Sequence, residues 1–196
     1  MRRLVRCFDR WLSRRYGIFE FSQHPDCLLR LQAAVAHRSL TLPDRRVERG
    51  EPVLLLHLWN ERLSALPPVD AGLSRAKTMQ RMIIRSLTEL ACYVDQHPEL
   101  AQRRALGGVT VLLGAGSHAG GVRLVERLGF SVFPYHSPLG CFGEFWENFY
   151  AWVLIWTYDP ASLPYHRLLS LRRREFWIST DEFRRRYRPG QGAGAG

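Results

Sequence analysis

The chain has 196 residues, of which 46% are hydrophobic and 23% are charged, so it is long enough for one globular domain with a sizeable core. This composition excludes a disordered tail protein, a collagen and a small disulfide scaffold. The longest apolar stretch, Phe149–Tyr158, has ten residues, whereas a membrane-spanning helix needs about 20. A bundle of transmembrane helices is therefore excluded.

The formal net charge of +10 is concentrated at the two ends of the chain. Residues 1–50 carry +6 and residues 161–196 carry +5, while the middle is nearly neutral. Basic ends on a neutral core favour contact with an acidic surface, either anionic lipid or nucleic acid. Of the 28 basic residues only Lys77 is a lysine. This bias is typical of a GC-rich genome, so the arginine count alone assigns no role to individual arginines.

Four cysteines stand far apart, without a C-x-x-C pair or a Cys/His cluster of zinc spacing. No arginine-led segment is followed by an apolar stretch of signal-peptide type. We therefore expect reduced, mostly buried thiols, a cytoplasmic protein and no metal site.

The N-terminal segment 2–15 predicts a basic amphipathic helix. One side carries apolar residues and the other carries arginines: Leu4, Val5, Phe8, Trp11 and Leu12 against Arg2, Arg3, Arg6, Arg10 and Arg14. In one interpretation the helix lies on the membrane, with the arginines contacting lipid phosphates and the aromatic rings entering the interface. In the other, its apolar side docks on the core.

The next elements predict a sheet with helices packed on it. Residues 29–35 alternate as in a strand, residues 43–46 form a turn, and residues 53–59 read as a central strand that is apolar on both faces. A long helix follows to about Gln96, capped by Asp70 or Ser74. Pro98 starts a short helix that Gly107-Gly108 ends. Residues 109–113 and 130–133 read as strands around a helix at 122–128. The order predicts an α+β fold with a mixed, partly parallel sheet covered by helices.

The C-terminal third predicts a helix, a strand and a final helix. Residues 144–158 form a helix that is apolar nearly all round, so it is either buried or leaves one side for a partner or the bilayer interface. Residues 176–178 read as a short strand, and Ser179-x-x-Glu182 is a capping box that opens a helix over 180–187. We expect a single domain over 1–188 and a flexible glycine- and alanine-rich tail over 189–196.

The end of the central strand is the first candidate site, because open α/β sheets bind ligands beyond the carboxyl ends of their strands. His57, Asn60 and Glu61 are the candidate catalytic residues there, next to Trp59. The alternation places His57 and Asn60 on opposite faces, and a hydrogen-bonded core histidine is the alternative interpretation of His57.

Three further patterns each have an ordinary explanation beside a functional one. Gly114 and Gly116 open a glycine-rich loop between a strand and a helix, which either cradles a phosphate or is a flexible connection. Glu144 and Glu147 are paired carboxylates or simply acidic residues at a helix N-terminus. The arginine runs 172–174 and 184–186 contact phosphates or form solvated faces.

Several of these segments resemble the YkoP-like domain family. The resemblance is carried by residues 50–53, which lead into Leu56-His57-Leu58-Trp59-Asn60, and by residues 108–110, 128–132 and 177–179. It extends from the N-terminal helix to Tyr187. The family has no established activity, and some members are similar to the segment fused behind polysaccharide deacetylase domains, which implies a cell-envelope setting. The chain is not itself the deacetylase, because the nearest H-x-x-x-H fragment has Gly140 in place of the second histidine.

The order of elements also resembles the core of the GNAT acyltransferases. Those enzymes hold the pyrophosphate of acyl-coenzyme A at the N-terminus of the long helix, which here implies Gly72, Leu73 and Ser74. The loop at this position carries Asp70, which repels phosphate.

We therefore expect an accessory domain of envelope polysaccharide or lipid metabolism that lies peripherally on the inner face of the membrane and takes no cofactor. Its partners are an anionic membrane surface or envelope-biosynthesis enzymes. The alternative is an acyltransferase that uses acetyl-CoA or another acyl-CoA. Nucleic-acid binding ranks last, because no aromatic stacking platform is interleaved with the arginines.

Overall fold

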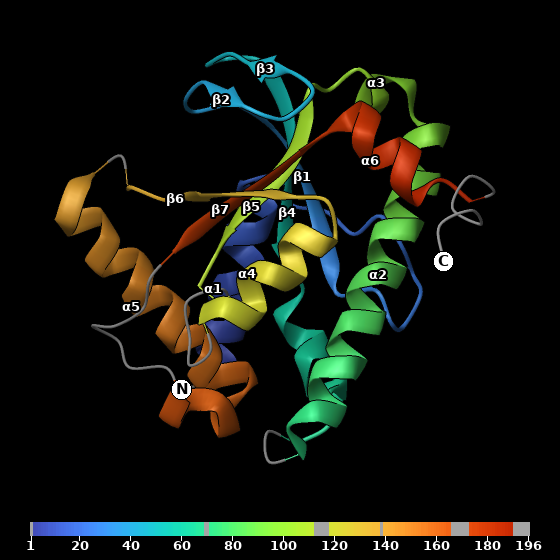
Figure 1. The fold of residues 1–196 in the computed structure, drawn as a ribbon. Coiled ribbons are helices and arrows are strands. Elements are labelled where there is room, and N and C mark those ends of the chain that lie inside the picture. The colour runs from blue at the N-terminus through green and yellow to red at the C-terminus, as the bar shows by residue number, and fades with distance from the viewer. Residues whose placement is uncertain (1, 69–70, 112–117, 138, 166–172, 190–196) are drawn as a thin grey trace.

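A five-stranded mixed sheet forms the centre of the molecule (Figure 1). The computed structural model describes residues 2–68, 71–111, 118–137, 139–165 and 173–189. The strand order is β1-β4-β5-β7-β6, and these strands span Leu29–Val35, Pro52–Leu58, Ala105–Thr110, Arg174–Ser179 and Ser131–Pro134. Neighbours pair antiparallel except β4 and β5, which are parallel. The predicted α+β class with a mixed, partly parallel sheet is confirmed.

One face of the sheet packs against helices α2 (Leu73–Gln96), α4 (His118–Arg127) and α6 (Thr180–Tyr187), which stand in front of it in Figure 1. The core on this face joins strand side chains such as Leu54, Leu106 and Ile178 to Leu90 of α2 and Phe183 of α6. The short helix α3 (Pro98–Ala101) follows α2 and has its proline in the first turn, as predicted.

The opposite face is covered by two separate elements. The β2–β3 hairpin (Leu40–Thr41 and Arg46–Val47) contributes Leu40 and Val47 to a second core cluster with Val53, Ala105 and Trp177 of the sheet. The other part of this face meets α1 (Arg2–Arg15), which lies behind the sheet in Figure 1 and packs against α5 (Gly140–Tyr158). Two 3-10 helices, η1 (Asn60–Ala65) and η3 (Pro160–Tyr165), follow β4 and α5.

The position predicted for strand β5 from the sequence is a few residues too late in the chain. The strand spans Ala105–Thr110 rather than 109–113, and Gly107-Gly108 lie inside it instead of ending the preceding helix. A Cβ on Gly107 would stand 2.3 Å from the Phe176 carbonyl oxygen and the Trp177 ring, and a Cβ on Gly108 would stand 2.6 Å from the Leu56 oxygen. The two glycines therefore let neighbouring strands approach closely, which is a different use of glycine from helix termination.

Most helix predictions are confirmed within a few residues, and the errors lie at their starts. α1 spans Arg2–Arg15 and α6 spans Thr180–Tyr187, where the Ser179 hydroxyl accepts a hydrogen bond from the Glu182 amide as the capping box requires. α2 begins directly after Gly72, whose φ is +43°, and no side chain caps it, so the predicted cap at Ser74 is wrong. Asp70, the other predicted cap, lies outside the described residues, as does the tail after residue 189.

The four cysteines are unpaired, but only Cys27 is buried, while Cys7 and Cys141 are exposed. The expectation of mostly buried thiols is therefore wrong. Among the described residues, no helix is both long enough and apolar enough to cross a membrane.

Candidate functional site

The side chains at the end of the central strand, β4, pack against other parts of the protein. β4 lies inside the sheet between β1 and β5, as predicted. His57 shares a face with Val53 and Leu55, and its Nε2 lies 2.8 Å from Oε1 of Gln32 on β1. Burial, and then the nearby charge of Arg30, lower the pKa of His57 to about 4. At pH 7 the ring is neutral and hydrogen-bonded, which favours the core-histidine interpretation over a catalytic one.

Asn60 and Glu61 leave the strand and enter η1. Trp59 is buried, with the Arg62 guanidinium 3.5 Å from its ring centroid, and its indole N–H donates to Glu61 Oε2 at 3.2 Å. Glu61 also pairs with Arg10 of α1 at 2.8 Å, and these hydrogen bonds, working against desolvation, hold its pKa below the ordinary value. These groups join α1 to the end of β4, so the space beyond the strand is occupied by protein.

A buried polar network that the sequence did not reveal lies beside His57. Asp9 of α1 is buried, and its carboxylate accepts hydrogen bonds from the Tyr150 hydroxyl at 2.8 Å and the Tyr158 hydroxyl at 3.3 Å. Arg30 stands 4.0 Å away. Burial, followed by the Asp9 charge, raises the pKa of Tyr150 above its ordinary value and that of Tyr158 to about 12. Both hydroxyls stay protonated as donors, and the network fixes α1 and α5 on the sheet.

The titration of His57 should make the protein less stable in acid. Its folded pKa of about 4 lies below the ordinary 6.5, so the unfolded chain binds a proton more readily. This contribution to the free energy of unfolding is complete above pH 6.5 and is lost as the pH falls to about 4, by up to about 3 kcal/mol. Urea unfolding across this range should show a steeper loss for the natural chain than for His57→Gln, whose side chain does not titrate. Parallel pH profiles would contradict the assignment.

The remaining sequence candidates are dispersed. Gly72, Leu73 and Ser74 lie at the start of α2, with Leu73 and Ser74 exposed to solvent. Gly114 and Gly116 lie outside the described residues. Glu147 accepts hydrogen bonds from Tyr135 and Ser137, and it pairs with Arg173 at 3.5 Å. Because α5 begins at Gly140, Glu144 and Glu147 stand beyond its first turn, so the explanation by the helix N-terminus is wrong.

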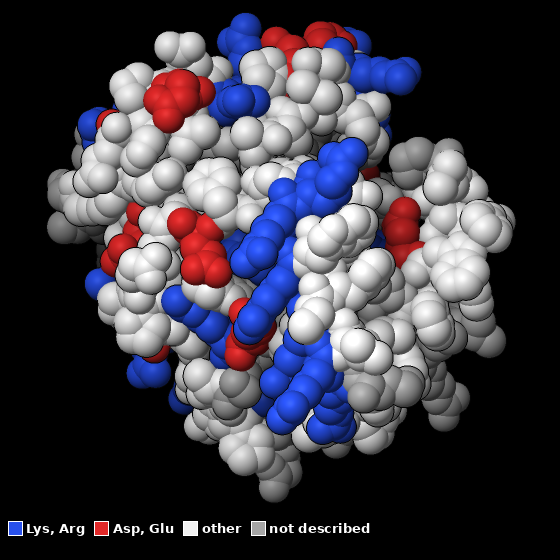
Figure 2. All heavy atoms as spheres, turned by 180° about the vertical axis from the view of Figure 1, so that it is seen from behind, with Lys and Arg blue, Asp and Glu red and all other residues white. Residues whose placement is uncertain are grey.

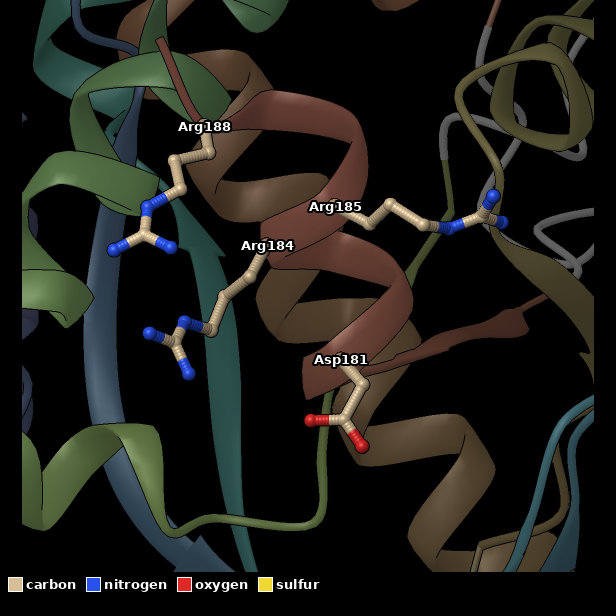
Figure 3. A pocket seen from close by; sticks show the side chains of 4 residues that line it. All are labelled: Asp181, Arg184, Arg185 and Arg188. Carbon is tan, nitrogen blue, oxygen red and sulfur yellow. The ribbon is translucent and has the colours of Figure 1, made fainter. Parts of the chain in front are cut away.

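A shallow pocket of about 220 Å³ on α6 is lined by Asp181, Arg184, Arg185 and Arg188 (Figure 3). Arg184 and Arg188 extend together on one side of the helix, and both pair with Asp95, at 2.8 and 2.7 Å. Arg185 points the other way and pairs with Glu182. Each arginine of this run is therefore already paired with a carboxylate of the chain, although Asp95 and Glu182 are each shared by two arginines.

A larger groove of about 770 Å³, which we call the β7 groove, lies over β7 on the hairpin side of the sheet. Its charged and histidine residues are His37, Arg38, Arg49, His136 and Glu175. Its buried charged residue is Glu175, whose side chain is 1% exposed. One carboxylate oxygen lies 3.2 Å from Nε2 of His37, and the other accepts from Arg38 and from the Trp177 indole, each at 3.0 Å. Sequence reasoning missed this site, because His37 and Glu175 stand 138 positions apart and Glu175 lies in the short strand β7, just before its apolar residues 176–178. A charged residue at an inward position of that strand was the available signal.

The α1 helix turns large apolar residues toward solvent. Its buried positions are Asp9 and Ser13, whereas Leu4, Phe8 and Trp11 are at least half exposed. The apolar side predicted to dock on either the core or lipid is thus divided, with Val5 and Leu12 facing inward in part. On α5, Phe142 is 69% and Trp146 is 51% exposed. We call these exposed residues of the two packed helices the aromatic surface: Leu4, Phe8, Trp11, Leu139, Phe142, Phe145, Trp146 and Phe149.

The rings of the aromatic surface contact one another within two groups, one on each helix. Phe145 and Trp146 each pack on Phe149, and Phe8 of α1 stacks on Trp11 and meets the edge of Tyr150 of α5. The apolar sequence of 144–158 left burial or an open side as alternatives, and the open side is observed.

Arginines flank this surface. Figure 2 looks onto the face that carries α1 and shows a stripe of basic side chains across its centre, bordered by uncharged residues. Arg2 and Arg6 lie over the rings of Trp156 and Tyr158 of α5, and Arg10 pairs with Glu61. Arg3 and Arg14 are exposed and form no salt bridge with the carboxylates of the described residues.

Comparison with known families matches the chain to the YkoP domain over residues 36–187. The matched region contains β4 to α6 and all the charged residues of the β7 groove, whereas α1 and β1 precede it. The resemblance expected from the N-terminal helix onward therefore begins later in the chain. No curated protein and no solved structure matches, and the GNAT-like order of elements and the acyl-CoA alternative stay predictions.

Proposed function

Because the chain belongs to the YkoP domain family, we propose that it is an accessory domain of cell-envelope polysaccharide or lipid metabolism that binds an anionic membrane surface peripherally. It docks through α1 and α5 and contributes no cofactor chemistry. The envelope setting rests on the resemblance of this family to segments fused behind polysaccharide deacetylases.

The observation that carries the proposal is the aromatic surface. Soluble monomers rarely expose so many neighbouring large apolar side chains without a partner. Phenylalanine and tryptophan prefer the boundary between headgroups and acyl chains, where amphipathic surface helices place them. Leu4, Phe8 and Trp11 are exposed on a helix whose buried positions, Asp9 and Ser13, are polar.

Charge supports lipid rather than a neutral protein partner. Arg3 and Arg14 stand beside the exposed rings on α1 with their charges unpaired among the described residues. Each basic group near an anionic leaflet contributes about 1 kcal/mol of binding. Arg2, Arg6 and Arg10 hold α1 against α5 and η1, so their replacement would disturb the helix as well as its charge.

Co-sedimentation with vesicles of phosphatidylcholine, with and without phosphatidylglycerol, tests the proposal. We expect binding that requires the anionic lipid and falls at least about tenfold in the double variant Arg3→Glu, Arg14→Glu. The matched control is Lys77→Glu, Arg81→Glu, which reverses two exposed charges on α2, on the other side of the sheet. Equal loss in the two double variants, or none in either, would refute docking through α1.

A further inference from the structure

The β7 groove is lined, among the described residues, by two guanidinium groups and one carboxylate. His37, Arg38, Arg49 and His136 line it, and Glu175 is the carboxylate among its described lining residues. Both oxygens of Glu175 are already occupied by His37, Arg38 and the Trp177 indole. An anion that enters the groove therefore meets guanidinium and imidazole groups, and the buried carboxylate acts on it only through partners that it has already bound.

Arg38 is held in place before any ligand arrives. Its Nη2 donates to Glu175 at 3.0 Å, and its guanidinium lies 5.5 Å from the centroid of the Phe133 ring. Its other nitrogens have no acceptor among the described residues, and the side chain is 39% exposed. A guanidinium fixed on one edge and open on the rest is suited to bidentate recognition of an oxyanion, because less side-chain entropy is lost on binding.

Three further polar residues line the groove: Arg49, His136 and His37. Arg49 follows the hairpin and is exposed; its backbone amide donates to the Ser39 hydroxyl, and its side chain forms no salt bridge with a carboxylate of the described residues. His136 follows β6 and is exposed. His37 uses its Nε2 to bind Glu175. The apolar part of the lining includes Val35, Phe133 and Pro134.

We propose that this groove binds the phosphate group of a phosphomonoester, with Arg38 and Arg49 as its principal ligands, the two histidines beside them, and the organic part of the ligand against Phe133 and Val35. A phosphate carries up to two negative charges and three acceptor oxygens, which matches two guanidinium groups better than a carboxylate does. The volume of about 770 Å³ lies in the range of small-molecule sites. Glu175 is a positioning residue, because it reaches the phosphate only through Arg38 and His37.

Isothermal titration with two soluble esters tests this site and its source. Glycerol 3-phosphate represents a free metabolite, and short-chain phosphatidic acid represents a lipid headgroup. We expect saturable binding of at least one ester, weakened at least about tenfold in Arg38→Ala, Arg49→Ala. Lys77→Ala, Arg81→Ala is the control, because it removes two exposed charges from α2.

The outcomes distinguish the two sources of the phosphate ester and test whether the groove binds it. Similar affinity for both esters assigns a free phosphorylated metabolite, and stronger binding of the lipid ester assigns a headgroup. Arg38→Lys, which keeps the charge without the guanidinium fork, should bind less tightly than the natural chain. Absence of saturable binding, equal affinity in the groove and control variants, or tighter binding of acetate than of the esters would overturn the proposal. The aromatic surface is untouched by these variants, so vesicle binding and ester binding fail independently.

Discussion

Replacement of three exposed rings of α5, in Phe142→Ser, Phe145→Ser, Trp146→Ser, should abolish most binding to anionic vesicles. Full burial of one such side chain contributes about 1.5–3 kcal/mol. Even half of that for three residues gives at least about 2 kcal/mol, and each 1.4 kcal/mol is about a tenfold change in affinity. We therefore expect a loss of about thirtyfold or more, measured by co-sedimentation over a range of lipid concentrations.

The variant should fold normally, because the three side chains are already 46–69% exposed. Its control is Leu73→Ser, Ile84→Ser, which removes two exposed apolar residues from α2 and should leave vesicle binding unchanged. Undiminished binding of the triple variant would show that α5 does not enter the lipid, even if the arginines of α1 contact it. A similar loss in the α2 control would indicate non-specific hydrophobic adsorption.

Replacement of Trp177 by alanine should have the largest effect on stability. Trp177 is 1% exposed, packs between the hairpin and the sheet, and donates its indole N–H to Glu175. Removing a buried ring of this size costs about 3–5 kcal/mol. In a chain of this length each kcal/mol lowers Tm by about 2–4 °C. Thermal unfolding should therefore shift downward by at least about 6 °C.

The same chemical change at Trp146 supplies the control. Trp146 is 51% exposed on α5, so Trp146→Ala should change the free energy of unfolding by no more than about 0.5 kcal/mol. If Trp177→Ala were as mild as Trp146→Ala, the hairpin would not be packed on the sheet as described. The β7 groove would then lack its fixed wall at His37 and Arg38.

Local sequence patterns predicted those elements whose identity depends on neighbouring residues. The boundaries of α1 and α6 follow from periodicity and from the Ser179 capping box, and the place of β4 inside the sheet follows from its apolar residues on both faces. The role of Gly107-Gly108 was predicted wrongly, because the residues that leave no room for a side chain there lie in β7 and β4, which are distant in sequence. A glycine pair by itself does not distinguish a helix end from a close strand contact.

The candidate sites show the same difference between what neighbouring residues predict and what depends on tertiary contacts. His57 was found from its position at a strand end, but its neutral, hydrogen-bonded state depends on Gln32 and Arg30 of the adjacent strand. Glu175 was not found, since its partners His37 and Arg38 are brought to it by the segment that leads into the hairpin.

The amino-acid sequence by itself determined the fold class, most helices, the basic amphipathic character of residues 2–15 and the family resemblance, because these depend on composition and on spacing within one segment. Only the tertiary structure decided which side of each amphipathic helix is covered. Asp9 is drawn inward by Tyr150 and Tyr158, and this rotation of α1 leaves Phe8 and Trp11 in solvent. Burial depends on the sum of contacts from elements far apart in the chain, and no local pattern contains that sum.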